Sequence, residues 1–200
     1  GRGGAVDWYA SNGHIADSNF KNNSAHYGGA LFVGQVAKAG NVSNSNFIDN
    51  HAYRGGAVDW NASFGDIMGS LFERNTAECS GGAIFIGISS EDGVIYNSTF
   101  RYNHADRYGG AIDWNATRGS LNNVTFYMNT ADGSGGALFV GKASTNSSIN
   151  DTRFINNSAV HKGGAIDWNA SNGKVAYSTF ENNSAEGDGV ITYAEGDAYD

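Results

Sequence analysis

The 200-residue chain contains 29 Gly and no Pro, and its formal net charge is −8. The absence of proline excludes collagen and proline-rich linkers, and a hydrophobic share of 40% argues against disorder. The acidic balance disfavours nucleic acid as a partner, and no apolar run is long enough to span a membrane. A single cysteine, Cys79, excludes an intrachain disulfide framework. We expect one domain over residues 1–200.

Two motifs recur seven times in a fixed phase. The first, Gly-Gly-Ala, begins at Gly3, Gly28, Gly55, Gly81, Gly109, Gly135 and Gly163. The second, Phe-x-x-Asn, begins at Phe20, Phe47, Phe72, Phe100, Phe126, Phe154 and Phe180. Both recur at intervals of 25–28 residues, which is the signature of a repeat architecture.

The segments between these motifs predict strands. They are short, rich in β-branched residues and interrupted by Gly and Asn, so each repeat should form two or three strands joined by turns. Leucine-rich, helix-pair, propeller and hexapeptide repeats have other periods or patterns. The pattern therefore predicts an all-β fold, a right-handed parallel β-helix (β-solenoid) of about seven coils of about 27 residues, stacked about 4.8 Å apart.

Alternate coils differ after Gly-Gly-Ala, which makes the structural unit a pair of coils of about 54 residues. Odd coils continue with aliphatic-Asp-Trp, and even coils with aliphatic-Phe-aliphatic-Gly. Strand parity places the tryptophans inward, with a smaller aliphatic at the same site of the even coils. The inward residues are Trp8, Val33, Trp60, Ile86, Trp114, Val140 and Trp168.

The Phe and Asn of the second motif predict structural stacks. The Phe should form a second column in the core, and the Asn a ladder at a corner that bonds the backbone of neighbouring coils. The residue two before each Phe is Ser or Thr except at Val124, so we expect a hydroxyl stack broken there.

Strand parity also predicts an outward column that alternates Asp with Phe. An exposed apolar ladder marks a candidate contact surface for another chain, a glycan or a neighbouring copy. The alternative, that loops of the same chain cover the column, stays open. This surface contact strip consists of Asp7, Phe32, Asp59, Phe85, Asp113, Phe139 and Asp167.

No catalytic residue, metal ligand or cofactor site is assigned. The Asp residues of the strip recur every two coils, about 10 Å apart, a marginal spacing even for an inverting glycosidase. They repeat as a stripe, whereas an active site is one special constellation. Three Asn-x-Ser/Thr sequons follow the tryptophans and are candidates for N-glycosylation, with an Asx or Ser/Thr turn as the alternative; they are Asn61, Asn115 and Asn169.

The motifs resemble two groups of surface proteins. Phe-x-x-Asn alternating with Gly-Gly-Ala-(Ile/Leu/Val) resembles the repeats of the chlamydial polymorphic membrane proteins, which are autotransporter adhesins. The segment Gly-Gly-Ala-Ile-Asp-Trp-Asn-Ala at 109–116 and 163–170 resembles adhesin-like surface proteins of methanogenic archaea. The resemblance implies a β-helix of the extracellular adhesin-like class and brings no catalytic residues with it.

We therefore expect a non-catalytic, extracellular cell-surface protein that is adhesin-like or fibre-forming. Its expected partners are neighbouring copies, end to end or laterally, and surface glycans or proteins, with no nucleic acid and no membrane span in this segment. The alternative is a carbohydrate-active or glycan-binding β-helix, of the lyase or glycosidase type. That alternative would require a single cluster of Asp, Lys or Arg that breaks the repeat, and none is evident in the sequence.

Overall fold

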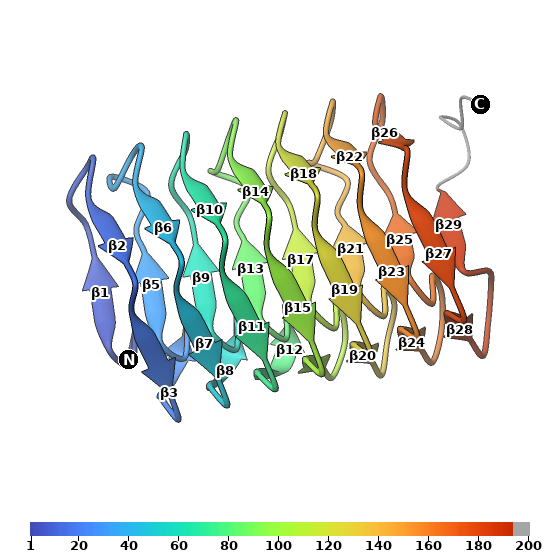
Figure 1. The fold of residues 1–200 in the computed structure, drawn as a ribbon, viewed down its shortest axis with the longest axis horizontal. Helices are drawn as coiled ribbons and strands as arrows, with labels where there is room; N and C mark the ends of the chain where they lie inside the picture. Colours follow the sequence, from blue (N-terminus) through green and yellow to red (C-terminus); the bar gives the residue numbers. More distant parts are fainter. Residues whose placement is uncertain (194–200) are drawn as a thin grey trace.

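The computed structural model describes residues 1–193 and is a β-solenoid of about seven coils. Successive coils lie side by side along the long axis of the molecule, and their strands stack into parallel sheets (Figure 1). No helix occurs among these residues, and accordingly none of them forms a helix that could cross a membrane. The predicted parallel β-solenoid is confirmed, but each coil contributes to four sheets rather than two or three.

The first sheet follows the Gly-Gly-Ala motifs and has eight strands. Its register pairs equivalent residues of neighbouring coils, for example Trp8 with Val33 and Val33 with Trp60. Its strands are β1 (Val6–Trp8), β5 (Leu31–Val33), β9 (Val58–Trp60), β13 (Ile84–Ile86), β17 (Ile112–Trp114), β21 (Leu138–Val140), β25 (Ile166–Trp168) and β29 (Ile191–Tyr193).

The second and third sheets have seven strands each. The second contains β2 (His14–Ala16), β6 (Asn41–Ser43), β10 (Asp66–Met68), β14 (Val94–Tyr96), β18 (Ser120–Asn122), β22 (Ser148–Asn150) and β26 (Lys174–Ala176). The third carries the Phe-x-x-Asn motif and contains β3 (Asn19–Lys21), β7 (Asn46–Ile48), β11 (Leu71–Glu73), β15 (Thr99–Arg101), β19 (Thr125–Tyr127), β23 (Arg153–Ile155) and β27 (Thr179–Glu181).

The fourth sheet is the one that the sequence pattern did not predict. Its short strands surround an inward alanine in each coil, for example Ala77 opposite Ala105. Because one small inward residue leaves little hydrophobic alternation, its signal in the sequence is weak. The strands are β4 (Ser24–Tyr27), β8 (His51–Arg54), β12 (Thr76–Ser80), β16 (His104–Ala105), β20 (Thr130–Ala131), β24 (Ser158–Ala159) and β28 (Ser184–Ala185).

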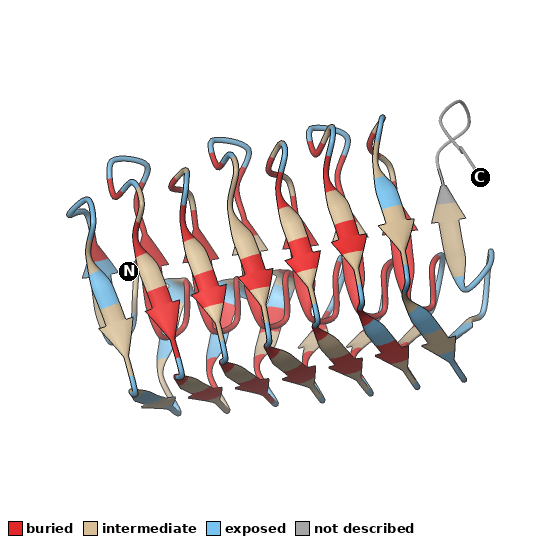
Figure 2. Ribbon diagram, turned by 45° about the horizontal axis from the view of Figure 1, so that its top comes forward, coloured by how far each residue is buried: buried red, intermediate tan, exposed pale blue. Residues whose placement is uncertain are grey.

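The core consists of continuous side-chain stacks. The seven Phe rings of the second motif lie nearly parallel, with neighbouring centroids 4.7–5.1 Å apart. The tryptophans point inward as predicted, and each indole N–H donates to the carbonyl two residues ahead, as Trp60 does to Ala62 at 3.0 Å. Figure 2 shows the buried positions recurring from coil to coil, with less burial in the first and last coils.

The corners explain the abundance of Gly and Asn. Asn103 shows the predicted amide ladder: its backbone N–H and side-chain amide both donate to Oδ1 of Asn129, and the amide also reaches the Phe72 carbonyl. The hydroxyl stack is also present, as in the Ser45 N–H to Ser70 Oγ bond. Gly55 has φ +63°, a left-handed conformation that favours glycine. Asn and Asp hold many of the other left-handed corner positions, which they tolerate better than other residues.

Candidate functional site

The outward column of the first sheet exists in the predicted register. Asp7 pairs with Phe32, Phe32 with Asp59, and Asp59 with Phe85. The alternation continues along the solenoid to Asp113, Phe139 and Asp167. The column therefore brings together all seven residues of the surface contact strip.

The expected exposure of that strip is wrong for most of its length. Phe32, Asp59, Asp113 and Asp167 are buried, with exposed fractions of 7%, 0%, 4% and 7%. Phe85 and Phe139 are half-buried, and Asp7 in the first coil is exposed. Side chains of the same chain, from the corner just before Gly-Gly-Ala, cover the column. The use of the column as a contact surface remains a prediction.

Arg54 covers the column at Asp59. Its Nε and Nη2 atoms each lie 2.8 Å from Oδ2 of Asp59, and Asn61 donates to Oδ1 at 2.6 Å. The guanidinium carbon lies 4.8 Å from the ring centroid of Tyr27 and 4.1 Å from that of Phe85. Burial raises the pKa of Asp59, and the adjacent guanidinium opposes that rise. This corner is a paired ionic contact covered by aromatic rings.

Asp113 occupies the equivalent place two coils further on but has no such cation. The corner residue there is Tyr108, whose ring packs 4.6 Å from that of Phe139. Asn115 donates to Asp113 at 2.8 Å, and Ser80 also bonds this carboxyl. Burial raises the pKa of Asp113 to about 7. This carboxyl therefore changes charge near neutral pH, in the middle of the column.

A groove of about 480 Å³ opens on the same face, over the first three coils. The residues that line it include aromatic, cationic and amide side chains but no Asp or Glu. They are Arg2, Tyr9, Tyr27, Phe32, Gly34, Gln35, Val36, Arg54 and Asn61.

The sequence analysis missed this groove, although a signal for it was present. The residue after Trp is Tyr9 in the first coil but Asn61 and Asn115 in the equivalent later coils. Those two asparagines bond the buried Asp of their own coil, whereas the Tyr9 ring packs beside Phe32 with centroids 6.0 Å apart. Departures from the repeat, rather than the repeat itself, identify the site.

The three candidate glycosylation sites lie in the turn after each Trp and are half-buried. The amide nitrogens of Asn61 and Asn115 donate to Asp59 and Asp113 at 2.6 and 2.8 Å. Glycosylation of either residue in the folded chain would require these bonds to break. Glycosylation of Asn61, Asn115 and Asn169 remains a prediction.

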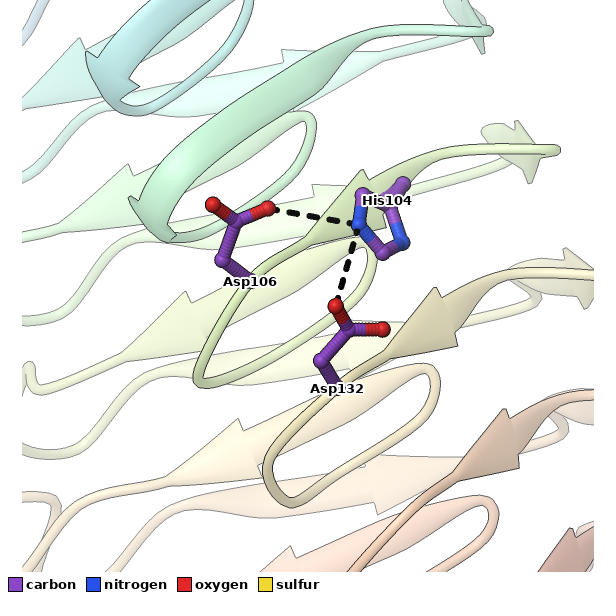
Figure 3. A group of neighbouring side chains, drawn as sticks. All are labelled: His104, Asp106 and Asp132. Carbon is purple, nitrogen blue, oxygen red and sulfur yellow. Dashed lines mark ion pairs between the residues drawn. The ribbon is translucent and has the colours of Figure 1, made fainter.

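One cluster of side chains on the fourth sheet has the chemistry of a cation site. His104 Nε2 lies 3.3 Å from Oδ1 of Asp106 and 3.9 Å from Oδ2 of Asp132 (Figure 3). The other ring nitrogen contacts Thr130 Oγ1 at 2.9 Å. An imidazole and two carboxylates are ligands that divalent metals accept. The two carboxylates are exposed, His104 is half-buried, and exposed acidic groups of this kind are common without a metal ion.

Comparison with known proteins gives one match. Residues 69–87 and 151–167 match the family model of the Chlamydia polymorphic membrane protein repeat. Each segment contains both a Phe-x-x-Asn and a Gly-Gly-Ala motif of the solenoid. No curated protein and no solved structure gives a significant match. In these two segments the chain is similar to the repeats of Chlamydia polymorphic membrane proteins.

Proposed function

We propose that this chain is a surface-exposed, adhesin-like β-helix that acts outside the cell without catalysing a reaction. The observation that carries the proposal is the match to the polymorphic membrane protein repeat on a uniform solenoid. Repeat solenoids present extended surfaces suited to binding other molecules.

The contact face that we propose is the outer face of the first sheet. It combines the exposed Asp7, the half-buried Phe85 and Phe139, and the groove over the first three coils. Other copies of the chain, end to end or laterally, are also proposed as partners, because β1 and β29 stand at the two edges of the first sheet and sheet edges are prone to pair with another chain.

Two measurements test this proposal. An antibody against the folded chain should label intact, unpermeabilised cells of the producing organism, and external protease should remove the label. Beads coated with the chain should adhere to a target cell surface more than beads coated with the heat-unfolded chain. Labelling that appears only after permeabilisation contradicts the surface location, and equal adhesion of both bead types contradicts the adhesin-like role.

A carbohydrate-active enzyme is the competing function. Asp59 and Asp113 are buried carboxylates in one column, so they are the residues that such an enzyme would most plainly use. Release of reducing ends from a polysaccharide panel, lost in Asp59→Asn or Asp113→Asn, would favour the enzyme over the adhesin-like module. The proposal expects no release by the wild-type chain.

A further inference from the structure

The solenoid contains its own internal comparison, because equivalent positions recur every two coils. The first two-coil unit differs from the second and third at several of them, and three of these differences introduce polar or aromatic side chains. Tyr9 stands where the later units have Asn61 and Asn115, and Tyr27 where they have Ser80 and Ser134. The third is Gln35, which corresponds to Ile88 and Lys142. All three exceptional residues line the groove.

These substitutions are not needed by the fold. The second and third units form the same strands in the same register with Asn, Ser and Ile or Lys at those places. A backbone that accepts either set of residues does not require the aromatic and amide groups of the first unit. The groove is therefore a place where the first unit departs from the later units without a requirement of the fold.

The charge of the groove favours an anionic ligand. The lining residues include two arginines and no acid, in a chain whose formal net charge is −8. Arg54 is already paired with Asp59. Arg2 is exposed, and its guanidinium carbon lies 5.0 Å from the Phe32 centroid while Nη1 donates to the Tyr9 hydroxyl at 2.6 Å. A guanidinium held in this way is arranged for a carboxylate.

The other lining groups favour a sugar ring. Tyr9 is 44% exposed, so its ring has surface available to the apolar face of a pyranose. Tyr27 is half-buried and already contacts the Arg54 guanidinium and the His26 ring, and it lines the groove beside Tyr9. Gln35 and Asn61 add amide groups that can bond hydroxyls. The volume of about 480 Å³ is in the range of small-ligand sites and suits one or two sugar residues.

We propose that this groove binds a carboxylate-bearing sugar residue, such as a uronic or sialic acid, with Arg2 holding the carboxylate and Tyr9 and Tyr27 contacting the ring. This deepens the proposed adhesin-like function and rests on it for the setting in which such a sugar is met. The exposed Asp7 lies on β1, in the same coil as Tyr9, but it does not line the groove.

The test is a titration of the isotope-labelled 200-residue chain by NMR with digalacturonate and with 3′-sialyllactose, up to about 10 mM because single-site sugar binding is weak. We expect at least one of them to shift the amide signals of residues 2, 9 and 35. Lactose and triglutamate are the comparison ligands, and they should bind at least about tenfold more weakly.

The chain supplies its own conservative variants. Tyr9→Asn and Gln35→Ile install residues that already stand at the equivalent positions of folded coils, so both variants should keep the wild-type fold. We expect each to weaken binding of the acidic sugar by about fivefold or more, and Arg2→Gln to remove the preference for it over lactose. Lys142→Ile, at the third-unit equivalent of Gln35, is the matched control and should bind as the wild type does.

Four results overturn the inference. The first is that neither acidic sugar binds, and the second is that Tyr9→Asn leaves binding unchanged. The third is that lactose binds as tightly as the acidic sugars. The fourth is that triglutamate binds as tightly as the acidic sugars, which would assign the groove to an acidic peptide. The bead-adhesion assay separates this inference from the proposed function. Adhesion without sugar binding would refute only the proposal that the groove binds an acidic sugar. Groove-dependent sugar binding by a chain that is absent from the cell surface would refute only the adhesin-like role.

Discussion

The corner that covers Asp59 and the corner that covers Asp113 have the same backbone but different chemistry. Both aspartates follow Gly-Gly-Ala, both lie in the outer column of the first sheet, and each accepts a bond from the Asn two residues ahead. Arg54 pairs with the first, whereas Tyr108 stands at the equivalent corner of the second. A repeat can thus keep the fold constant while one corner side chain sets the charge of the surface.

This difference changes the free energy needed to ionise each buried carboxyl group. A buried carboxylate is costly unless it is paired and hydrogen-bonded. Arg54 supplies the pairing for Asp59 and opposes the rise in its pKa that burial causes. Asp113 has only neutral donors, and burial raises its pKa to about 7. The two coils therefore respond differently to pH although they share the Gly-Gly-Ala, Asp-Trp-Asn-Ala and Phe-x-x-Asn motifs.

The largest expected effect comes from Arg54→Tyr, which gives Asp59 the corner residue of Asp113. Removing one partner of a buried ion pair should lower the free energy of unfolding by about 3–5 kcal/mol at pH 8. The loss should be smaller at pH 5, because Asp59 can then take up a proton. Urea unfolding at both pH values measures this. An equal loss at the two pH values would mean that Arg54 acts through packing alone.

Asp113→Asn should have the next largest effect on the free energy of unfolding, and at pH 8 it should raise that free energy. Folded Asp113 keeps its proton up to about pH 7, while an unfolded Asp loses it near 4, so the folded state binds more protons between these values. The unfolding free energy of the wild type should therefore fall, by on the order of 4 kcal/mol from this group, as pH rises from about 4 to about 7.

The Asn variant lacks this dependence, so its difference from the wild type should grow over the same pH window and reach about 2 kcal/mol or more at pH 8, in its favour. Urea unfolding as a function of pH measures the difference. A constant difference between pH 4 and pH 8 would show that Asp113 does not titrate in that range.

Tyr108→Arg should have a smaller stabilising effect, since it supplies Asp113 with the missing cation. We expect a gain of about 1 kcal/mol at pH 8, because part of the attraction is offset by ordering the long side chain, and no gain at pH 5. The comparison of the two pH values is the measurement. Stabilisation at pH 5 that matches that at pH 8 would point to packing rather than charge.

The smallest effect is expected for Asp7→Asn, at the exposed end of the column. An exposed substitution away from buried partners should change the unfolding free energy by less than about 0.5 kcal/mol at either pH. It is the matched control for Asp113→Asn. A larger change would show that exposure is not what separates the two positions.

Much of the fold could be predicted from the sequence, because a repeat multiplies weak local signals. The inward tryptophans, the Phe stack, the Asn ladder and the hydroxyl stack all follow from period and strand parity, and all are confirmed. The fourth sheet was missed because its inward residue is a lone alanine such as Ala105, which leaves no alternation to detect.

The candidate site could be predicted only in part. Parity correctly places Asp59 and Phe85 outward, but parity says nothing about which side chains fold over them. That cover comes from Arg54, five residues before Asp59, and depends on the course of its side chain across the corner. The groove could not be predicted from the repeat pattern, because Tyr9 and Tyr27 are positions at which the first unit departs from that pattern.

The central claim is that the corner residue sets the charge of the outer column. The most direct measurement is a carboxyl ¹³C NMR titration of the wild type and of Tyr108→Arg. The account predicts that Asp113 titrates near pH 7 in the wild type and at a clearly lower pH in the variant. Titration of Asp113 near pH 4 in the wild type, or the same midpoint in both proteins, would contradict it.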